Sequence, residues 1–438
     1  MRIKIFAVAF LMLAVTGGMA GAQSFDARRM GMGGVVLGGG PAGEAANVAY
    51  RAVPSASKNV NIPLPLGLIP VIADPPTFDS SNPDFNVFRL ADLLYNPPWN
   101  LRIGGEDAPA SDIVISIAKD RLAVDLGDIA KVFPEDDSRS GGISNGPAFS
   151  VGMRGFFAGV APLIEYQNDL SLNDALRGAL RHGQPFVPST EYALFDNASG
   201  QAALGVHLGA ALPLIQHGKA RAPGSMGIYG GARLKILRGM AYGAADNLAA
   251  FTTDSVLFND PVDLHYSAYY RTATPDGGRL GRGLDLGVVW LLGPTEVGLG
   301  VNDIATRIDW RVEESVAQRD SATGQYVRQV LRSDVPYTSE VPLTLTANAA
   351  VQLGGWLVAG DVVRGVNSTS GHLGAEIWLR NLALRAGAGI DGEGHPQFGC
   401  GTGVRFGFLG VDLALASNSR NVTHERSYEL GAGLALYR

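Results

Sequence analysis

The sequence predicts an all-β protein, a closed antiparallel transmembrane β-barrel, and three observations lead to this fold class. The chain starts with a secretory signal. Its composition is too apolar for an ordinary soluble domain, although no run of 18 or more apolar residues follows that signal. Apolar residues then alternate with polar or small ones in one segment after another, each about 10 residues long. Together these observations favour strands over helices as the membrane-crossing elements.

Residues 1–22 have the parts of a secretory signal peptide. Arg2 and Lys4 form a basic start, residues 5–15 an apolar core, and residues 20–22 an A-x-A cleavage motif. We therefore expect cleavage near Ala22. No cysteine lies near this site, so we expect no lipoprotein anchor.

Composition narrows the class of protein further. Of the 438 residues, 46% are hydrophobic, 17% are charged and 58 are glycine, whereas an ordinary soluble domain has about 25% charged residues and about 7% glycine. The net charge of −6 disfavours nucleic-acid binding, which needs a basic face. The single cysteine, Cys400, excludes an internal disulfide. A closed barrel accounts for this composition, because its outer face meets lipid and its inner face is free to be polar or small.

Period-2 alternation marks the expected strands. It is clearest in three long segments, residues 204–214, 226–236 and 343–353, and recurs in shorter ones, residues 262–270, 284–290, 382–390, 398–408, 409–415 and 428–436. In the second long segment, Leu234 and Ile236 face one way while Arg233 and Lys235 face the other. Each long segment is about long enough to cross a bilayer as a tilted strand. A secreted β-sandwich is the alternative, but so many segments behind a signal peptide favour the barrel.

Turns and one helix are predicted between the strands. Glycine-containing turns at residues 276–278, 293–294 and 391–394 fit antiparallel hairpins. Residues 171–174 resemble a helix capping box, and Leu172, Leu176 and Leu180 follow at a spacing of four before Gly183. We expect a short extramembrane helix there, rather than a partner-binding helix. The charged, alternating residues 307–332 indicate a hairpin that extends beyond the membrane.

Three motifs suggest chemistry that their context disfavours. Glycines at positions 38, 40 and 43 form a G-x-G-x-x-G frame, but only three apolar residues precede it and no acid follows about 20 residues on. Residues 142–146 match G-x-S-x-G, yet they precede a strand instead of a helix. The histidines show no metal-ligand spacing, and Asp391, Glu393 and His395 fit a solvated hairpin tip. We expect no enzyme, no cofactor and no metal site.

Several stretches are similar to one known group of barrels. They are GLDLGVVW (283–290), VGLGVNDI (297–304), HLGAEIWL with LALRAGAGIDG (372–392), FGCGTGVRFGFLGVDLALA (398–416) and, near the amino terminus, DARRMGMGGV (26–35). These stretches resemble the FadL-like superfamily of outer-membrane barrels, which includes the PorV and PorQ type associated with secretion. The chain departs from the family in lacking an Asn-Pro turn at residues 50–54 and in ending on Arg438, with Tyr437 before it.

The resemblance implies about 14 antiparallel strands, from near Ile113 to Tyr437, and an N-terminal plug in the lumen. We divide the chain into a signal peptide (1–22), a plug and lead-in segment (23–110) and a barrel (111–438). Glycines would let the plug backbone turn tightly beside the inner wall; a flexible periplasmic leader is the alternative. The expected plug residues are Phe25, Met30, Met32, Gly33, Gly34 and Tyr50.

Charged side chains on the inner face are the candidate site residues. They are Arg233, Lys235, Asp285, Glu296, Glu376, Arg385, Arg405 and Asp412. They either line a permeation path or form ion pairs that hold the barrel's shape, and the sequence does not separate these two roles.

The resemblance also implies a function and a location. It implies a passive channel for hydrophobic or amphipathic small molecules in the outer membrane of a Gram-negative-type bacterium. The alternative is a non-transporting PorV-type barrel that binds exported proteins or a secretion machine. Expected partners are outer-membrane lipid, the barrel-assembly machinery and a hydrophobic small-molecule ligand, with no nucleic acid.

Overall fold

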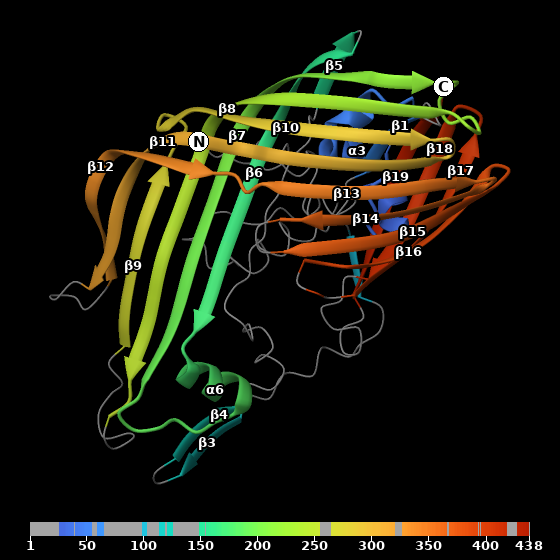
Figure 1. Ribbon diagram of the computed structural model, residues 1–438. Helices are drawn as coiled ribbons and strands as arrows, with labels where there is room; N and C mark the ends of the chain where they lie inside the picture. The colour runs from blue at the N-terminus through green and yellow to red at the C-terminus, as the bar shows by residue number, and fades with distance from the viewer. Residues whose placement is uncertain are drawn as a thin grey trace.

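The computed structural model is mainly antiparallel β-sheet (Figure 1). It describes residues 26–38, 40–54, 59–64, 99–102, 114–118, 121–125, 149–153, 155–254, 264–319, 326–365, 368–392, 394, 396–417 and 427–437. Four predictions lie outside these residues: the signal peptide (1–22), Phe25, the loop at 142–146, and Glu393 with His395. None of the described helices is long and apolar enough to cross a membrane.

Within the described ranges, 17 strands form one sheet, and β3 (Val114–Ala118) and β4 (Arg121–Asp125) form a separate pair. The first group of strands in the large sheet is β1 (Asn59–Leu64), β2 (Trp99–Arg102), β5 (Phe149–Met153), β6 (Phe156–Leu172), β7 (Glu191–His217), β8 (Met226–Thr252), β9 (Leu264–Ala273), β10 (Gly278–Leu292), β11 (Thr295–Arg319) and β12 (Tyr326–Glu340). The second group is β13 (Thr344–Leu353), β14 (Trp356–Arg364), β15 (Thr369–Leu379), β16 (Leu382–Ile390), β17 (Pro396–Phe406), β18 (Leu409–Ser417) and β19 (Ser427–Tyr437).

Strand pairing follows the chain, with two side branches. From β5 the order runs through β6, β7, β8, β10, β11 and β13, and then in sequence to β19. β9 branches off between β8 and β11, and β12 pairs with the far part of β11. Among the described residues, no strand pairing joins β5 to β1 or β2, so the observed unit is one continuous antiparallel sheet.

The strand count differs from the expected value. The sheet has 17 strands instead of about 14, because β9 and β12 are side branches and β1 and β2 share one position along β19. β1 and β2 lie before residue 111, and the start of the barrel at that residue stays a prediction. Strands of six and four residues are too short to reveal period-2 alternation.

Each of the nine alternating segments overlaps one strand of the sheet, and residues 307–332 do form a hairpin, of β11 and β12. Some strands run farther than the alternation indicated. β7 and β8 have 27 residues each, whereas a tilted strand needs only about 9–11 residues to cross a bilayer. The long strands therefore carry the sheet well beyond the thickness of one membrane.

The predicted helix is α6 (Asp174–His182), which lies beside β4 at the end of β6 (Figure 1). Its capping residue is Asn173, whose Oδ1 accepts a hydrogen bond from the Leu176 backbone N–H at 2.9 Å. We expected Ser171 to cap the helix, but β6 continues through Leu172 and keeps Ser171 in an extended strand. Gly183, with φ of 57°, ends the helix.

The two faces of the sheet have opposite polarity. On three strands of the sheet, Leu208, Leu234 and Leu299 point away from the molecule and are 45%, 46% and 45% exposed. Side chains one position along, such as Arg233 and Asp285, point to the other face and are 1% and 0% exposed. The sheet thus exposes leucine and buries charge, the reverse of a soluble protein.

Candidate functional site

The N-terminal segment, residues 26–54, packs on the sheet face that buries charge. It contains α2 (Ala27–Gly31), α3 (Gly40–Ala46) and the 3-10 turn η1 (Val48–Arg51). α2 contacts β16, β17, β18 and β19, and η1 contacts β7, β8 and β10. Figure 1 shows this segment in blue among these strands. One short stretch of chain therefore joins two distant parts of the sheet.

A first row of glycines receives the backbone near η1. Gly231, Gly287 and Gly300 lie opposite one another on β8, β10 and β11. A Cβ atom at Gly287 would lie 2.0 Å from the Asn47 side-chain oxygen, and one at Gly300 would lie 2.2 Å from the Ala46 carbonyl oxygen. Only glycine allows the segment to approach the strands this closely.

A second row does the same for the turn that follows α2. Gly374, Gly387 and Gly399 lie opposite one another on β15, β16 and β17. A Cβ atom at Gly374 would lie 2.4 Å from the Met32 carbonyl oxygen, and one at Gly399 would lie 2.2 Å from the Met30 carbonyl oxygen. The two rows of glycines therefore receive backbone atoms from two different parts of the N-terminal segment.

Replacing one of these glycines by alanine tests whether the two rows hold the segment in place. A Cβ atom at Gly387 would lie 2.2 Å from the Met32 backbone, so Gly387→Ala should displace the segment. Tryptic cleavage after Arg28 or Arg29 should then become several-fold faster, because the cleavage rate follows the population of molecules in which the segment has detached. The matched control is Gly371→Ala on β15, where the new Cβ would meet its nearest atom at 3.6 Å. Equal cleavage rates in the two variants would contradict this role.

Ion pairs add to the contact at α2. The Arg28 guanidinium lies 2.7 Å from Glu376, Arg385 lies 2.7 Å from the other oxygen of Glu376, and Arg385 also lies 2.6 Å from Asp412. Burial lowers the pKa of Arg28, but the charge of Glu376 and its hydrogen bonds outweigh this effect and raise that pKa above its usual value. Arg28 is therefore held as a cation by the wall it packs on.

A second charge cluster lies beneath α3. Asp285 is fully buried between Arg233 at 2.5 Å and Lys235 at 2.8 Å, and Lys235 also lies 2.7 Å from Asp303. The Asp303 backbone N–H donates to Asp285 at 2.8 Å. Arg233 further donates to the backbone carbonyls of Glu44 and Ala45, each at 3.4 Å. This cluster satisfies its own charges and also holds the end of α3.

Polar contacts secure the residues around η1. Asn302 donates to the carbonyls of Ala45 and Ala46, both at 3.1 Å. Asn348 donates to the Tyr50 hydroxyl. Burial and the nearby charge of Glu296 raise the pKa of Tyr50 above its usual value, so this hydroxyl stays protonated. Polar atoms of the strands thus hold the segment at several points along its length.

The candidate residues from the sequence occupy mostly one face. Seven are buried on the face that carries the segment: Arg233, Lys235, Asp285, Glu296, Glu376, Arg385 and Asp412. Arg405 is different, because it is exposed near the β17–β18 turn and its Nε donates to the Gly407 carbonyl at 3.0 Å. Five expected plug residues, Met30, Met32, Gly33, Gly34 and Tyr50, lie in the packed segment.

Sequence analysis missed several partners. Arg28 and Asn47 were not singled out, and Asp361, which pairs with His372 at 2.7 Å and accepts from the Val36 backbone N–H, was also missed. Asp361 lies on β14, outside every alternating segment identified in the sequence, so no local signal pointed to it. In the part of the chain that the structure describes, no group of three or more His, Cys, Asp or Glu side chains is placed to hold a metal ion.

Comparisons with known proteins give matches among solved structures alone. No family model matches the chain, and no curated protein matches it. The toluene transporter TodX of Pseudomonas putida is 12% identical, with 64% of this chain and 87% of that chain covered and a TM-score of 0.27. The CymD monoaromatic hydrocarbon channel is 12% identical, covering 66% and 89% at a TM-score of 0.28. The siderophore receptor PirA of Pseudomonas aeruginosa is 12% identical, covering 64% and 66% at 0.23.

Proposed function

We propose that this chain is an outer-membrane β-barrel that passively admits hydrophobic or amphipathic small molecules, with residues 26–54 as a plug in its lumen. The signal peptide would direct export and be removed near Ala22. The observation that carries the proposal is the reversed polarity of the sheet, with leucine exposed on one face and charge buried on the other.

The free-energy cost of the outward leucines depends on whether they face water or hydrocarbon. Leaving one leucine in water instead of burying it costs about 1.5–3 kcal/mol, and outward leucines recur on neighbouring strands, as at Leu208, Leu234, Leu286 and Leu299. In hydrocarbon these side chains carry no such cost. The outward face is therefore suited to lipid, and the inward face, with its paired charges and glycines, is suited to a filled lumen.

Closure of the sheet follows from the same reasoning. A strand edge left open in hydrocarbon would expose unpaired backbone N–H and C=O groups, each costing several kcal/mol. The edges of the observed sheet are β5 at one end and β1 with β2 at the other. We propose that these ends meet and close the barrel.

An apolar wall beyond the charge clusters supports passage of apolar molecules. Along β8, Leu237 follows Arg233 and Lys235 on the same face and is fully buried. It packs with side chains of β6, β7, β8 and β11 and of the connection between β12 and β13: Leu163, Ala203, Tyr242, Ile308, Trp310, Val312 and Val341 form the cluster with it. These side chains are buried against one another, and an apolar molecule that parted them would contact hydrocarbon and aromatic groups before it reached the charged layer. The three solved structures named above are a transporter, a channel and a receptor.

Deleting residues 25–54, with the signal peptide kept, tests the proposal. The strands supply the hydrogen-bond ladder, so the shortened protein should still fold, with heat-modifiable migration on gels. Loss of the plug should raise conductance in planar bilayers and speed the entry of small polar solutes. Binding of long-chain apolar probes should weaken, because the plug forms one wall of their path.

Three outcomes would overturn separate parts of the proposal. A mainly helical circular dichroism spectrum would contradict the barrel. Unchanged conductance in a correctly folded deletion variant would contradict the plug. An intact protein that neither binds nor passes apolar probes of several sizes would contradict the channel.

A further inference from the structure

A row of arginines borders the apolar outward face on three neighbouring strands. Arg238, Arg282 and Arg307 are exposed on β8, β10 and β11; we call them the arginine row. Arg282 lies directly opposite Arg307, and Arg238 lies opposite Leu280, two positions from Arg282. The three cations therefore sit side by side across the sheet.

The row lies where an apolar band would end. On β10 the outward residues from the short turn at Gly293 are Leu292, Trp290, Val288, Leu286 and Leu284, and the next is Arg282. Ten residues span about 33 Å along a strand. At the usual tilt of about 35–45° this is about 25 Å along the barrel axis, the height of the apolar band in such barrels. The row would thus lie level with lipid headgroups.

Among the residues that the structure describes, the cations of the row lack anionic partners. Arg282 and Arg307 face each other, an arrangement of like charges that destabilises a strand pair. Among the described residues, neither has a carboxylate within the 4.0 Å of an ion pair, although Glu340 lies opposite Arg307 on β12. Arg238 donates only to the Pro275 carbonyl, at 3.5 Å. An anion between these side chains would relieve their repulsion.

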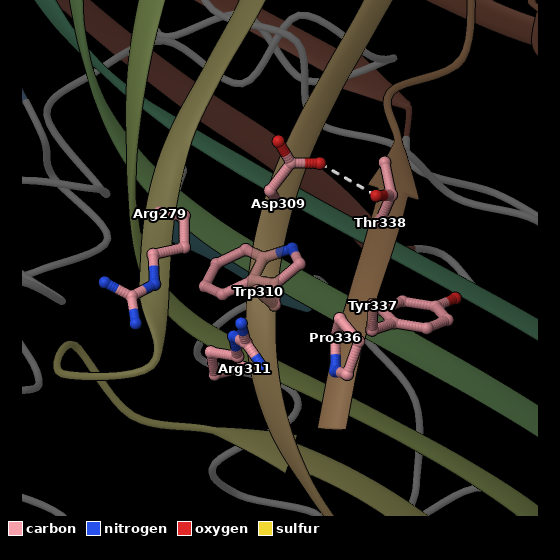
Figure 2. A pocket seen from close by; sticks show the side chains of 7 residues that line it. All are labelled: Arg279, Asp309, Trp310, Arg311, Pro336, Tyr337 and Thr338. Atoms are coloured by element: carbon pink, nitrogen blue, oxygen red, sulfur yellow. Dashed lines mark hydrogen bonds between the residues drawn. The ribbon is translucent and has the colours of Figure 1, made fainter. Parts of the chain in front are cut away.

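A cleft of about 350 Å³ continues the basic surface (Figure 2). It is lined by Arg279, Asp309, Trp310, Arg311, Pro336, Tyr337 and Thr338. Figure 2 shows Asp309 directed toward Thr338, which donates to it at 2.8 Å, and away from Arg279 and Arg311. Arg311 donates to the Asp334 carbonyl at 3.0 Å and lies 3.6 Å from the Asp334 carboxylate, and both contacts are exposed. Neither arginine is buried, so both can reach a bound anion.

We infer that the arginine row and this cleft bind the phosphate groups of a membrane lipid whose acyl chains lie on the adjoining leucines. The inference rests on the proposed position in a membrane. Arginine binds phosphate oxygens through two parallel hydrogen bonds, and headgroup phosphates are the anions found at the edge of an apolar band. Free phosphate would use the same side chains but gain nothing from Leu284 or Leu286.

Lipid binding by the purified protein in nonionic detergent tests the inference. The probes are diphosphorylated lipid A, the same glycolipid without phosphates, and inorganic pyrophosphate. Arg282→Gln with Arg307→Gln should weaken lipid A binding at least about tenfold, since two charge-assisted contacts are lost. The matched control, Arg380→Gln with Arg405→Gln, removes two exposed arginines near the short turns and should leave the affinity unchanged.

The outcomes separate this inference from the proposed function. The inference would be overturned if the row variant bound lipid A as tightly as the wild type does, or if the control variant lost as much affinity as the row variant. It would also be overturned if the glycolipid without phosphates bound as tightly as lipid A. Pyrophosphate binding as tight as that of lipid A would overturn the assignment to a lipid. Heat-modifiable migration on gels is recorded for each variant in parallel. If this migration persists while lipid binding does not depend on the arginine row, the lipid site is contradicted and the barrel is not. If the wild type shows no heat-modifiable migration, the barrel itself is contradicted.

Discussion

Asp285→Asn is expected to destabilise the folded protein by about 3–5 kcal/mol, because it leaves two buried cations short of a counter-charge. Asp285 is the partner of Arg233 and Lys235, and all three side chains are at most 2% exposed. Only Asp303 would remain, 2.7 Å from Lys235. Reversible urea unfolding in lipid vesicles measures the difference. From the sequence alone, Asp285→Asn should cost much less than Leu286→Arg unless Asp285 is tightly paired, and the structure shows that it is tightly paired.

The control for this prediction is Asp309→Asn on β11. Asp309 is exposed, and its hydrogen bond from Thr338 is a surface contact. Its removal should change stability by no more than about 0.5 kcal/mol. Similar small costs at both positions would mean that the charge cluster at Asp285 does not hold the fold.

Leu286→Arg is expected to cost about 2–4 kcal/mol in a bilayer, the cost of arginine near the midplane on the lipid face of a barrel. Leu286 is 42% exposed and lies between Arg282 and the short turn on β10. If the same face met water, replacing an exposed leucine would change stability by only about 0.5 kcal/mol. Unfolding from lipid vesicles therefore distinguishes the two environments.

A depth control is available on the same strand. Leu280 is 65% exposed and lies beyond the arginine row, where the bilayer would already have ended. Leu280→Arg should cost about 0–1 kcal/mol. Equal costs at positions 280 and 286 would contradict the proposed depth of the apolar band.

The strands could be predicted from the sequence because their physical signal is local. Leu234 and its neighbour Lys235 already indicate that one face is apolar and the other polar, and the same alternation over residues 226–236 marks β8. β1 and β2 are too short to repeat that signal, and only their pairing with β19 places them in the sheet. Alternation also assigns a face without assigning a depth. For this reason Arg405, which alternation correctly assigns to the inward-facing set of β17, is exposed to solvent near a turn.

The partners in the candidate site could not be predicted, because they join residues far apart in the chain. Arg28 and Glu376 are 348 residues apart, and nothing near either one indicates the other. Asp303 enters its cluster through an irregular backbone, with φ of 61°, at the point where the pairing of β10 with β11 shifts. The glycines of β8, β10 and β11 could be read only as small inner-face residues. That they form a row against the N-terminal backbone is visible only once the strands are in register.

The accessibility of the outward leucines tests the central claim most directly. In a Cys400→Ser background, single cysteines at positions 234, 286 and 299 would carry nitroxide labels in the protein reconstituted into lipid vesicles. The account predicts that dissolved oxygen relaxes all three labels strongly while a water-soluble nickel chelate barely reaches them, and that a label at position 280 responds to the chelate. Ready access of the chelate to positions 234, 286 and 299 would place this face in water and contradict the membrane barrel.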